Sequence, residues 1–443
     1  MKIKDIVRFH SETTTPIPDV VYHLYSLPSF DNNQTREELL GQDIQSNKFT
    51  VPNRCILFNK LNVRFKRIWR IDSDEDHKIA STEFLPLIID ENKVDFDYCF
   101  YLLASPAITD YLCGQNANTS GSHKRIDPTN FFNIGIKLPP LAQQYEIGKL
   151  LSSLDTKIKL NRQINQNLEA MAKQLYDYWF VQFDFPNEEG KPYKSSGGEM
   201  VWNEKLKRNM PKEWCAMTIG EVENNIITGK TPSCADEDNF GGDIPFITID
   251  DIRGNLFVFN SQRTLSTKGA ESQTKKYLPS GSLSVSCIGT IGVMGFIAKL
   301  SQTNQQINSI VFENEHNREF VYFALKLYFE NAKAKTGNVF ANMSKDEFAS
   351  IKVVYSPKQI LQEFHNKVVA IFDNIKNNID EINALTKQRD ELLPLLMNGQ
   401  AMVNSDLLAC ILSYILISVY RNLGIISFAG NLPINTKTTI SRL

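Results

Sequence analysis

The most regular feature of the chain is a pair of long stretches whose apolar residues alternate at spacings of four and three. The first covers residues 147–179 and the second covers residues 364–396. This alternation is a heptad seam, the pattern by which helices pack as coiled coils. Asn161 and Asn378 share one seam position, where a polar residue costs stability but fixes register and partner. Each stretch predicts a helix of roughly 40 residues, about 60 Å long.

The seam that these spacings predict has six members in the first stretch and seven in the second. They are Leu151, Leu154, Ile158, Asn161, Leu168 and Leu175, and Val368, Ile371, Ile375, Asn378, Ile382, Leu385 and Leu392.

The two stretches belong to a larger internal duplication with an offset of 217 residues. Phe131 matches Phe348 in the strand-like segment before each helix, and Pro140 matches Pro357 at the helix start. Prolines suit the first turn of a helix and would break its interior. Two unrelated amphipathic helices, each packed on its own domain, are the alternative. The repeat includes the preceding strand and proline, which favours a duplication.

About 140 residues before each helix are rich in β-branched and aromatic residues, as in Ile244–Ile252 and Leu283–Ile297, and predict strands. Ile3–Ile6 weakly resembles Ile219–Val222, and the Gly-, Lys- and Pro-rich segment Pro186–Trp214 predicts a linker. We therefore expect an α+β protein with two mixed α/β domains, each followed by a long helix. The predicted divisions are a first domain 1–140, a helix 141–181, a linker 182–215, a second domain 216–355, a second helix 356–400 and a tail 401–443.

The tail contains one nearly unbroken apolar run of 14 residues, Leu407–Tyr420. It is shorter than the roughly 18 to 20 residues that a membrane span needs. A buried or partner-packed helix, a membrane contact and a read-through extension without a selected role all remain open.

Composition narrows the picture without deciding it. At 443 residues, 42% hydrophobic and 22% charged, the chain suits a soluble protein of two or three domains. A net charge of −2 provides no global basic field, so any nucleic-acid contact needs a local basic surface. The seven cysteines contain no CxxC, and no His pair stands nearby at zinc spacing, so we predict no metal site. Scattered thiols and a polar N-terminus without a signal peptide predict a cytoplasmic protein.

Motifs for chemistry are incomplete wherever they are suggested. Gly229–Thr231 resembles the end of a phosphate loop, but Asn224 replaces the leading glycine and Pro232 blocks the helix start. Cys287–Gly292 lacks the GxGxxG spacing, and Pro139–Pro140 lacks the flanking residues of an amino-methyltransferase motif. We therefore predict no catalytic and no cofactor-binding residues in this chain.

The best candidate for DNA contact is Asn59–Arg70, which carries five basic residues and no acid, with Phe65 and Trp69 between them. Basic side chains contact phosphates, and Arg also reads guanine in the major groove. A solvated strand edge with Trp69 in the core is the alternative, and exposed lysines are often only solvated. The residues that we predict to contact DNA are Lys60, Arg64, Lys66, Arg67, His123, Lys124 and Arg125 in the first domain, and Lys230, Thr231, Lys275, Lys276 and Asn338 in the second.

Six stretches resemble sequence motifs of one known family. They are Ile226–Pro232 (IITGKTP), Gly241–Asp250 (GGDIPFITID), Ile288–Gly292 (IGTIG), Leu138–Gln144 (LPPLAQQ), Glu391–Gln400 (ELLPLLMNGQ) and Trp179–Gly198 (WFVQFDFPNEEGKPYKSSGG). Together with the duplication, they make residues 1–400 similar to the specificity subunits of type I restriction-modification enzymes.

The resemblance implies that each domain is a target-recognition domain reading one half of a split double-stranded DNA sequence. It also implies that the two helices pair antiparallel as a coiled coil, set the half-site distance and dock two modification subunits. S-adenosylmethionine, ATP and Mg²⁺ are then expected on the modification and motor-nuclease (restriction) subunits, and no membrane partner is expected. Two features depart from the family: Tyr355–Lys358 replaces the expected Leu-Pro-Pro-Leu, and the tail continues beyond Gln400.

Two other functions are compatible with the same residues. The chain could be an interaction protein whose two domains read protein or carbohydrate. It could also be a detached specificity segment of a fused restriction-methylation enzyme. A steep salt dependence of DNA binding separates the first from our interpretation, and copurifying subunits separate the second.

Overall fold

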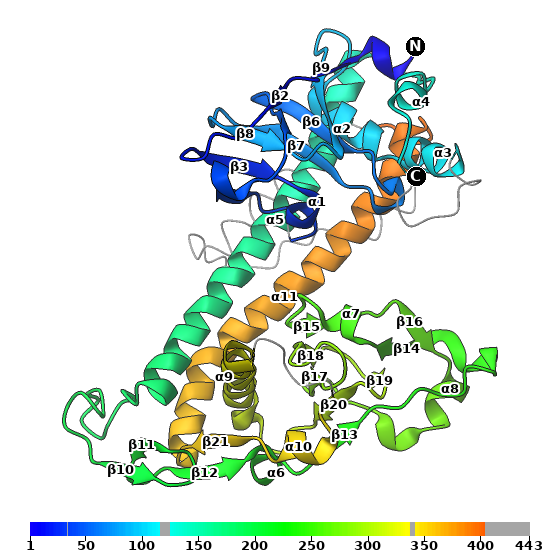
Figure 1. Ribbon diagram of the computed structural model, residues 1–443. Helices are drawn as coiled ribbons and strands as arrows, with labels where there is room; N and C mark the ends of the chain where they lie inside the picture. The colour runs from blue at the N-terminus through cyan, green and yellow to red at the C-terminus, as the bar shows by residue number, and fades with distance from the viewer. Residues whose placement is uncertain (33, 116–124, 337–341, 404–443) are drawn as a thin grey trace, which may run out of the picture. The chain divides into compact units, whose positions relative to one another are not determined.

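The computed structural model describes residues 1–32, 34–115, 125–336 and 342–403 (Figure 1). It divides into a first unit, Met1–Ile158 with Ala384–Leu443, and a second unit, Lys159–Asn383. The long helices α5 (Leu141–Tyr176) and α11 (Lys358–Met397) each contribute residues to both units. Each unit therefore combines one domain with a part of both helices.

The first unit is built on two sheets, one antiparallel and one mixed. The four-stranded sheet has the order β1-β9-β6-β7, with β1 (Val7–Phe9), β6 (Arg54–Asn59), β7 (Ile68–Asp72) and β9 (Phe84–Ile89). The five-stranded sheet has the order β2-β5-β8-β3-β4, with β2 (Thr13–Thr14), β3 (Val21–Tyr25), β4 (Glu37–Leu40), β5 (Lys48–Thr50) and β8 (Lys78–Ala80). The short helices are α1 (Leu27–Asp31), α2 (Phe96–Ala104), α3 (Pro106–Gln115) and α4 (Pro128–Phe132).

The main core of this unit lies where the antiparallel sheet meets α2 and both long helices. Leu87 of β9, Leu103 of α2 and Leu151 of α5 are all fully buried in it. Leu396, near the end of α11, belongs to the same cluster. The end of the chain's last described helix is thus part of the first domain's core.

The second unit has the same ingredients in a different arrangement. A five-stranded sheet has the order β13-β20-β17-β18-β15, with β13 (Ile226–Thr228), β15 (Phe257–Val258), β17 (Leu283–Ser286), β18 (Met294–Ile297) and β20 (Ile307–Ile310). A three-stranded sheet has the order β16-β14-β19, with β14 (Phe240–Ile247), β16 (Arg263–Leu265) and β19 (Gln302–Thr303). The helices are α6 (Ile219–Val222), α7 (Ile249–Ile252), α8 (Thr267–Glu271), α9 (Arg318–Thr336) and α10 (Lys345–Ala349). Mixed sheets with a long helix after each domain confirm the predicted α+β class.

One predicted strand is partly wrong. Ile244–Ile252 was expected to be extended, but β14 ends at Ile247 and α7 follows at once. The cause is local: the backbone nitrogen and hydroxyl of Thr248 both donate to Asp251, at 2.8 and 2.7 Å. This capping box starts a helix within a segment whose β-branched composition favours a strand.

The segment predicted as a linker is folded. It forms a hairpin of β10 (Met200–Asn203) and β11 (Arg208–Pro211), and Phe183, Phe185 and Trp214 are buried in the core of the second unit. Phe185 stacks on Trp214 with ring centroids 5.0 Å apart. Aromatic burial therefore orders the segment whose Gly-, Lys- and Pro-rich composition predicted a linker.

The duplication is visible in how each domain closes on itself. In the first domain the backbone nitrogen of Ile3 donates to the carbonyl of Ile134 at 3.1 Å, and in the second that of Ile219 donates to Ile351 at 2.9 Å. The second domain extends this contact into a ladder of β12 (Cys215–Thr218) with β21 (Lys352–Tyr355). The weak similarity between the starts of the two domains thus marks a shared closure.

Both long helices start at the matching prolines. The carbonyl of Pro140 accepts a hydrogen bond from the nitrogen of Gln144 at 3.0 Å, and the carbonyl of Pro357 accepts one from Leu361 at 3.3 Å. α5 has 36 residues and passes into a π-helical turn, Asp177–Val181, whereas α11 has 40 residues. At 1.5 Å per residue these are helices of about 54 and 60 Å.

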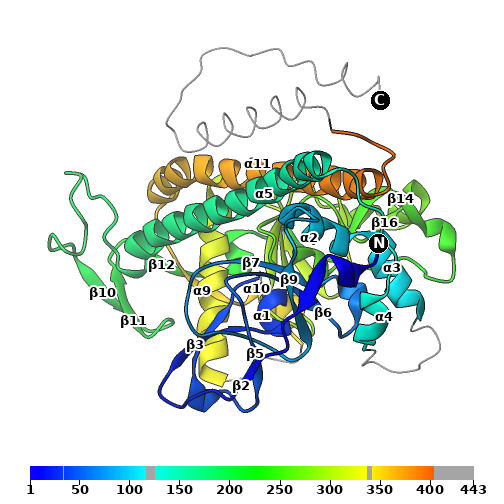
Figure 2. The same ribbon diagram turned by 90° about the horizontal axis from the view of Figure 1, so that it is seen from above.

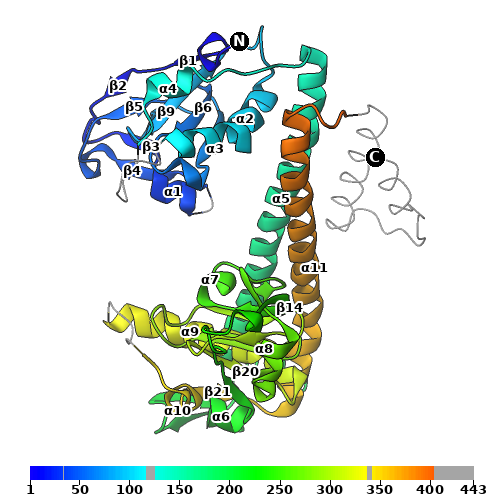
Figure 3. The same cartoon turned by 90° about the vertical axis from the view of Figure 1, so that its right-hand side faces the viewer.

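Within each unit α5 and α11 lie side by side (Figures 2 and 3). In the second unit Asn161 Nδ2 donates to Glu381 at 2.7 Å, and Asn378 Nδ2 donates to Asn165 at 2.8 Å. In the first unit Arg389 binds Asp155 at 2.7 Å. As the residue number rises along α5 in the second unit, that of its partner on α11 falls, so the two helices are antiparallel there. Each predicted seam residue is buried or half-buried, while heptad packing as such stays a prediction.

The apolar run Leu407–Tyr420 lies outside the described residues. Among the helices that the structure does describe, none has the length and apolar character to cross a membrane.

Candidate nucleic-acid interface

The basic stretch of the first domain is a loop between two buried strands. β6 ends at Asn59 and β7 begins at Ile68, and the loop between them makes two left-handed turns, at Asn62 (φ 51°) and Lys66 (φ 23°). Val63 is buried and holds the loop to the core. Anchored strands on both sides and a buried residue at the centre give this loop a defined surface.

Trp69 does not belong to that surface. Its side chain is buried, and its ring lies 4.8 Å from Tyr25 and 5.6 Å from Phe30. The alternative considered for Trp69, a place in the core, is therefore confirmed for this residue. Phe65, in contrast, is 49% exposed and is the loop's accessible aromatic side chain.

The cations around Phe65 differ in how far other groups neutralise them. Arg64 and Arg67 lie over the Phe65 ring, at 4.6 and 4.9 Å from its centroid. Arg67 also makes a bidentate ion pair with Asp31, with both distances 2.7 Å. Arg64 and Lys66 are exposed and have no ion-pair partner among residues that the structure describes. The available positive charge of this loop therefore resides on Arg64 and Lys66.

The structure brings a second predicted segment to the same loop. Arg125 forms a β-bridge with Leu61, and the nitrogen of Ile126 donates to the carbonyl of Lys60 at 2.9 Å. The Arg125 side chain is exposed but donates from Nε to Glu83 at 3.0 Å, and this hydrogen bond raises the pKa of Arg125. His123 and Lys124 lie outside the described residues.

In the second domain two predicted segments that are distant in the sequence meet. Lys276 donates from Nζ to the carbonyl of Thr228 at 2.9 Å. Gln273, which is buried, donates to the carbonyl of Lys230 at 2.8 Å. Lys230 and Lys275 are exposed, and neither has an ion-pair partner in the described part of the chain. Lys276 is instead half-buried and used to hold the two segments together.

Gly229 allows the backbone around Lys230 to pack closely against the neighbouring segment. A Cβ at this position would lie 2.1 Å from the carbonyl oxygen of Asn304, so only glycine fits without a backbone shift. Thr231 donates its hydroxyl to Gln305 at 2.6 Å. Sequence reasoning missed Gln273 and Gln305, because an isolated glutamine carries no pattern. Asn338 lies outside the described residues.

Comparison with known proteins gives one consistent family. Residues 1–170 and 211–390 each match the family described as type I restriction modification DNA specificity domain. The two matched ranges coincide with the two copies of the duplication. The chain therefore belongs to the type I restriction-modification DNA specificity family.

Individual relatives agree with this assignment. The chain is 31% identical to the type I restriction enzyme HindI specificity subunit of Haemophilus influenzae over 396 residues, covering 78% of this chain and 86% of that protein. It is 22% identical to the type I restriction enzyme MjaIX specificity subunit of Methanocaldococcus jannaschii, covering 71% of each. The type I restriction-modification S subunit from M. genitalium has the same fold, with a TM-score of 0.52 at 14% identity over 89% of this chain and 95% of that one.

Proposed function

We propose that this chain is the DNA-reading subunit of a type I restriction-modification complex and that each of its domains reads one half of a bipartite target. The match of the specificity family to both copies of the duplication carries this proposal. Two independent readers on one chain are what a split recognition sequence requires.

The loops described above supply the chemistry for such reading. Arg64, Lys66, Lys230 and Lys275 are exposed cations that can neutralise phosphates, which gives affinity and orientation without sequence information. Thr231 with Gln305 supplies neutral donors and acceptors, which suit base edges.

The chain is proposed to act without catalysis of its own. Modification subunits carrying S-adenosylmethionine and motor-nuclease subunits using ATP and Mg²⁺ would perform the reactions in the cytoplasm. The incomplete cofactor motifs support this division of labour. Robust methylation or cleavage by the purified chain, given all three cofactors, would contradict it.

The bipartite proposal is tested by mapping methylated adenines in cells that carry the whole system. The expected motif has two specified halves and an unread gap. The pair Thr231→Ala and Gln305→Ala should alter one half and leave the other unchanged. Glu237→Gln, an exposed change elsewhere in the second domain, is the control. A change in both halves, or a motif of one half only, would overturn the proposal.

The two long helices are proposed to set the gap. One heptad inserted after Asn161 and one after Asn378 keep both seams in phase and lengthen each helix by about 10 Å. That length equals roughly three base pairs of B-DNA. Methylome mapping of the insertion variant should show the same half-sites with a gap longer by a few base pairs. An active variant with an unchanged gap would mean that the helices do not measure it.

A further inference from the structure

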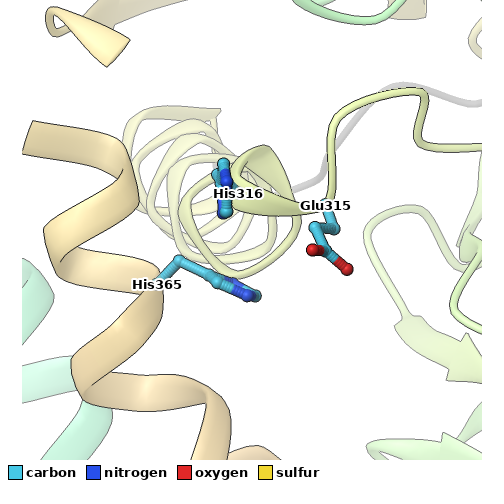
Figure 4. Close-up of side chains that lie close together, drawn as sticks. All are labelled: Glu315, His316 and His365. Carbon is cyan, nitrogen blue, oxygen red and sulfur yellow. The ribbon is translucent and has the colours of Figure 1, made fainter. Parts of the chain in front are cut away.

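The second unit contains a cluster of three side chains that none of the functions above uses. Glu315 and His316 lie in the 3-10 turn Glu315–Asn317 directly before α9, and His365 lies on α11 (Figure 4). One potential ligand atom from each side chain lies within 4.8 Å of the other two. The cluster thus joins the start of α9 to α11 inside one unit.

His365 is held in a single orientation. Its Nδ1 lies 2.7 Å from Oε2 of Glu319, a carboxylate that is fully buried. The other oxygen of Glu319 accepts from Nε of Arg318 at 2.8 Å. A carboxylate on one imidazole nitrogen fixes the ring and leaves the opposite nitrogen, Nε2, as a ligand atom. This is the arrangement by which proteins orient metal-binding histidines.

His316 provides the second, independent observation. Its ring lies 5.0 Å from that of His365, and its Nδ1 is buried without a hydrogen-bond partner among the described residues. A buried polar atom without a partner is unfavourable, and each such case in a folded protein calls for an explanation. Glu315 is exposed, so its carboxylate can move toward the two rings.

We propose that Glu315, His316 and His365 bind one divalent transition-metal ion of the zinc class, with Glu319 as the positioning residue for His365. Two imidazoles and one carboxylate form a donor set for zinc or cobalt, whereas magnesium and calcium prefer oxygen ligands. Ligand atoms around tetrahedral zinc lie about 3.4 Å apart. The three ligand atoms here lie within 4.8 Å of one another, so small side-chain rotations bring the set together, with exposed Glu315 the freest to move. Water takes the fourth position. The ion joins the turn before α9 to α11.

The first domain has no such cluster at the matching place. The duplication offset aligns His365 with Gly148 of α5 and Glu319 with Leu102 of α2. A Cβ on Gly148 would lie 2.8 Å from the backbone nitrogen of Tyr98, so α5 and α2 touch directly there. In the second domain the same helix junction is bridged by side chains, and a bridging ion belongs to that arrangement alone.

The test uses the full, untagged chain after treatment with a chelator. Titration with Co²⁺ should produce the visible absorption of a tetrahedral site with one ion per chain. Zn²⁺ should displace the Co²⁺ signal and raise the Tm by about 5 °C at a hundredfold excess over Kd. His316→Gln and Glu315→Gln should each abolish the absorption and the Tm rise.

Two further variants complete the experiment. His77→Asn removes an exposed imidazole from the first unit, at a left-handed residue (φ 54°) where Asn is tolerated, and should leave metal binding unchanged. Glu319→Gln keeps all three ligands and should weaken binding by about 10- to 100-fold. If His316→Gln fails to fold, the exposed Glu315→Gln change still decides. No tetrahedral absorption, or equal binding by Glu315→Gln and His77→Asn, would overturn the proposal.

Discussion

The two domains close in the same way but present their cations differently. Ile3 with Ile134, and Ile219 with Ile351, seal the first and second domain through one equivalent backbone contact. In the first domain Arg67 and Arg125 are bound to Asp31 and Glu83. In the second, Lys276 is bound to a backbone carbonyl instead. Each domain keeps two exposed cations without ion-pair partners in the described part of the chain, Arg64 and Lys66 in the first and Lys230 and Lys275 in the second. The duplication thus repeats the frame, while each loop set has its own electrostatics.

The junction between the domain and its following helix differs as well. The first domain uses direct contact at Gly148, whereas the second uses the polar set around His365. Direct backbone contact tolerates no added atom, and a polar junction requires that each buried group find a partner. Equivalent positions in a duplicated fold can therefore be fixed by opposite means.

The shared frame should give the largest effect. Phe131 and Phe348 are matched by the duplication and both are fully buried. Phe131→Ala and Phe348→Ala should each lower the free energy of unfolding by about 3–5 kcal/mol, because each leaves a cavity in a packed core. Urea unfolding, with hydrogen exchange to locate the loss, measures the effect. Phe65→Ala, at an exposed ring, is the control and should change stability by about 0.5 kcal/mol or less. A loss at only one of the two matched positions would break the equivalence.

The second largest effect on stability should come from a buried thiol in each domain, and it should depend on pH. Burial raises the pKa of Cys55 to about 12 and that of Cys287 to about 11. Below about pH 8.5 such a thiol is protonated in both the folded and the unfolded state, and stability is fully present. As the pH rises from there toward the folded pKa, the thiol ionises only in the unfolded state, and the free energy of unfolding falls. Between pH 8.5 and 10 each buried thiol should lower the free energy of unfolding by up to about 2 kcal/mol.

Cys55→Ala and Cys287→Ala should each reduce the alkaline loss of stability relative to the unchanged chain, as measured by urea unfolding at pH 8 and 10. Cys215→Ala is the matched control because this thiol is exposed. An unaltered pH dependence in both buried variants would show that these thiols have the same pKa in the folded and unfolded states, which would contradict the prediction.

The electrostatic difference between the loops should give the smallest effect. Lys275→Ala should flatten the slope of log affinity against log salt by about 0.9, since it removes one free cation. Arg67→Ala should change the slope much less, because Asp31 already offsets its charge. Binding to a short duplex between 50 and 200 mM salt is sufficient to measure both. Equal slopes for the two variants would mean that Asp31 releases Arg67 on DNA.

The local patterns of the sequence predicted the two long helices and the duplicated domain arrangement. Heptad spacing reports which residues share a helix face, and matched prolines report where a helix begins, so the long helices follow from short-range geometry. The duplication similarly predicted that Ile3–Ile6 and Ile219–Val222 hold equivalent places. Where composition alone was used, the prediction was weaker: a capping box at Thr248 ended a predicted strand, and buried aromatic rings folded the predicted linker.

What only the tertiary structure decided is which polar groups meet. Arg67 looked like a free cation because Asp31 is distant in sequence, yet the two form a bidentate pair. The cluster proposed to bind a metal ion likewise joins residues that are distant in the sequence, since His316 and His365 follow no short ligand spacing. Periodicity is a property of neighbouring residues and is written in the chain itself. Charge pairing and ligand geometry depend on distances across the fold, and those exist only once the chain has packed.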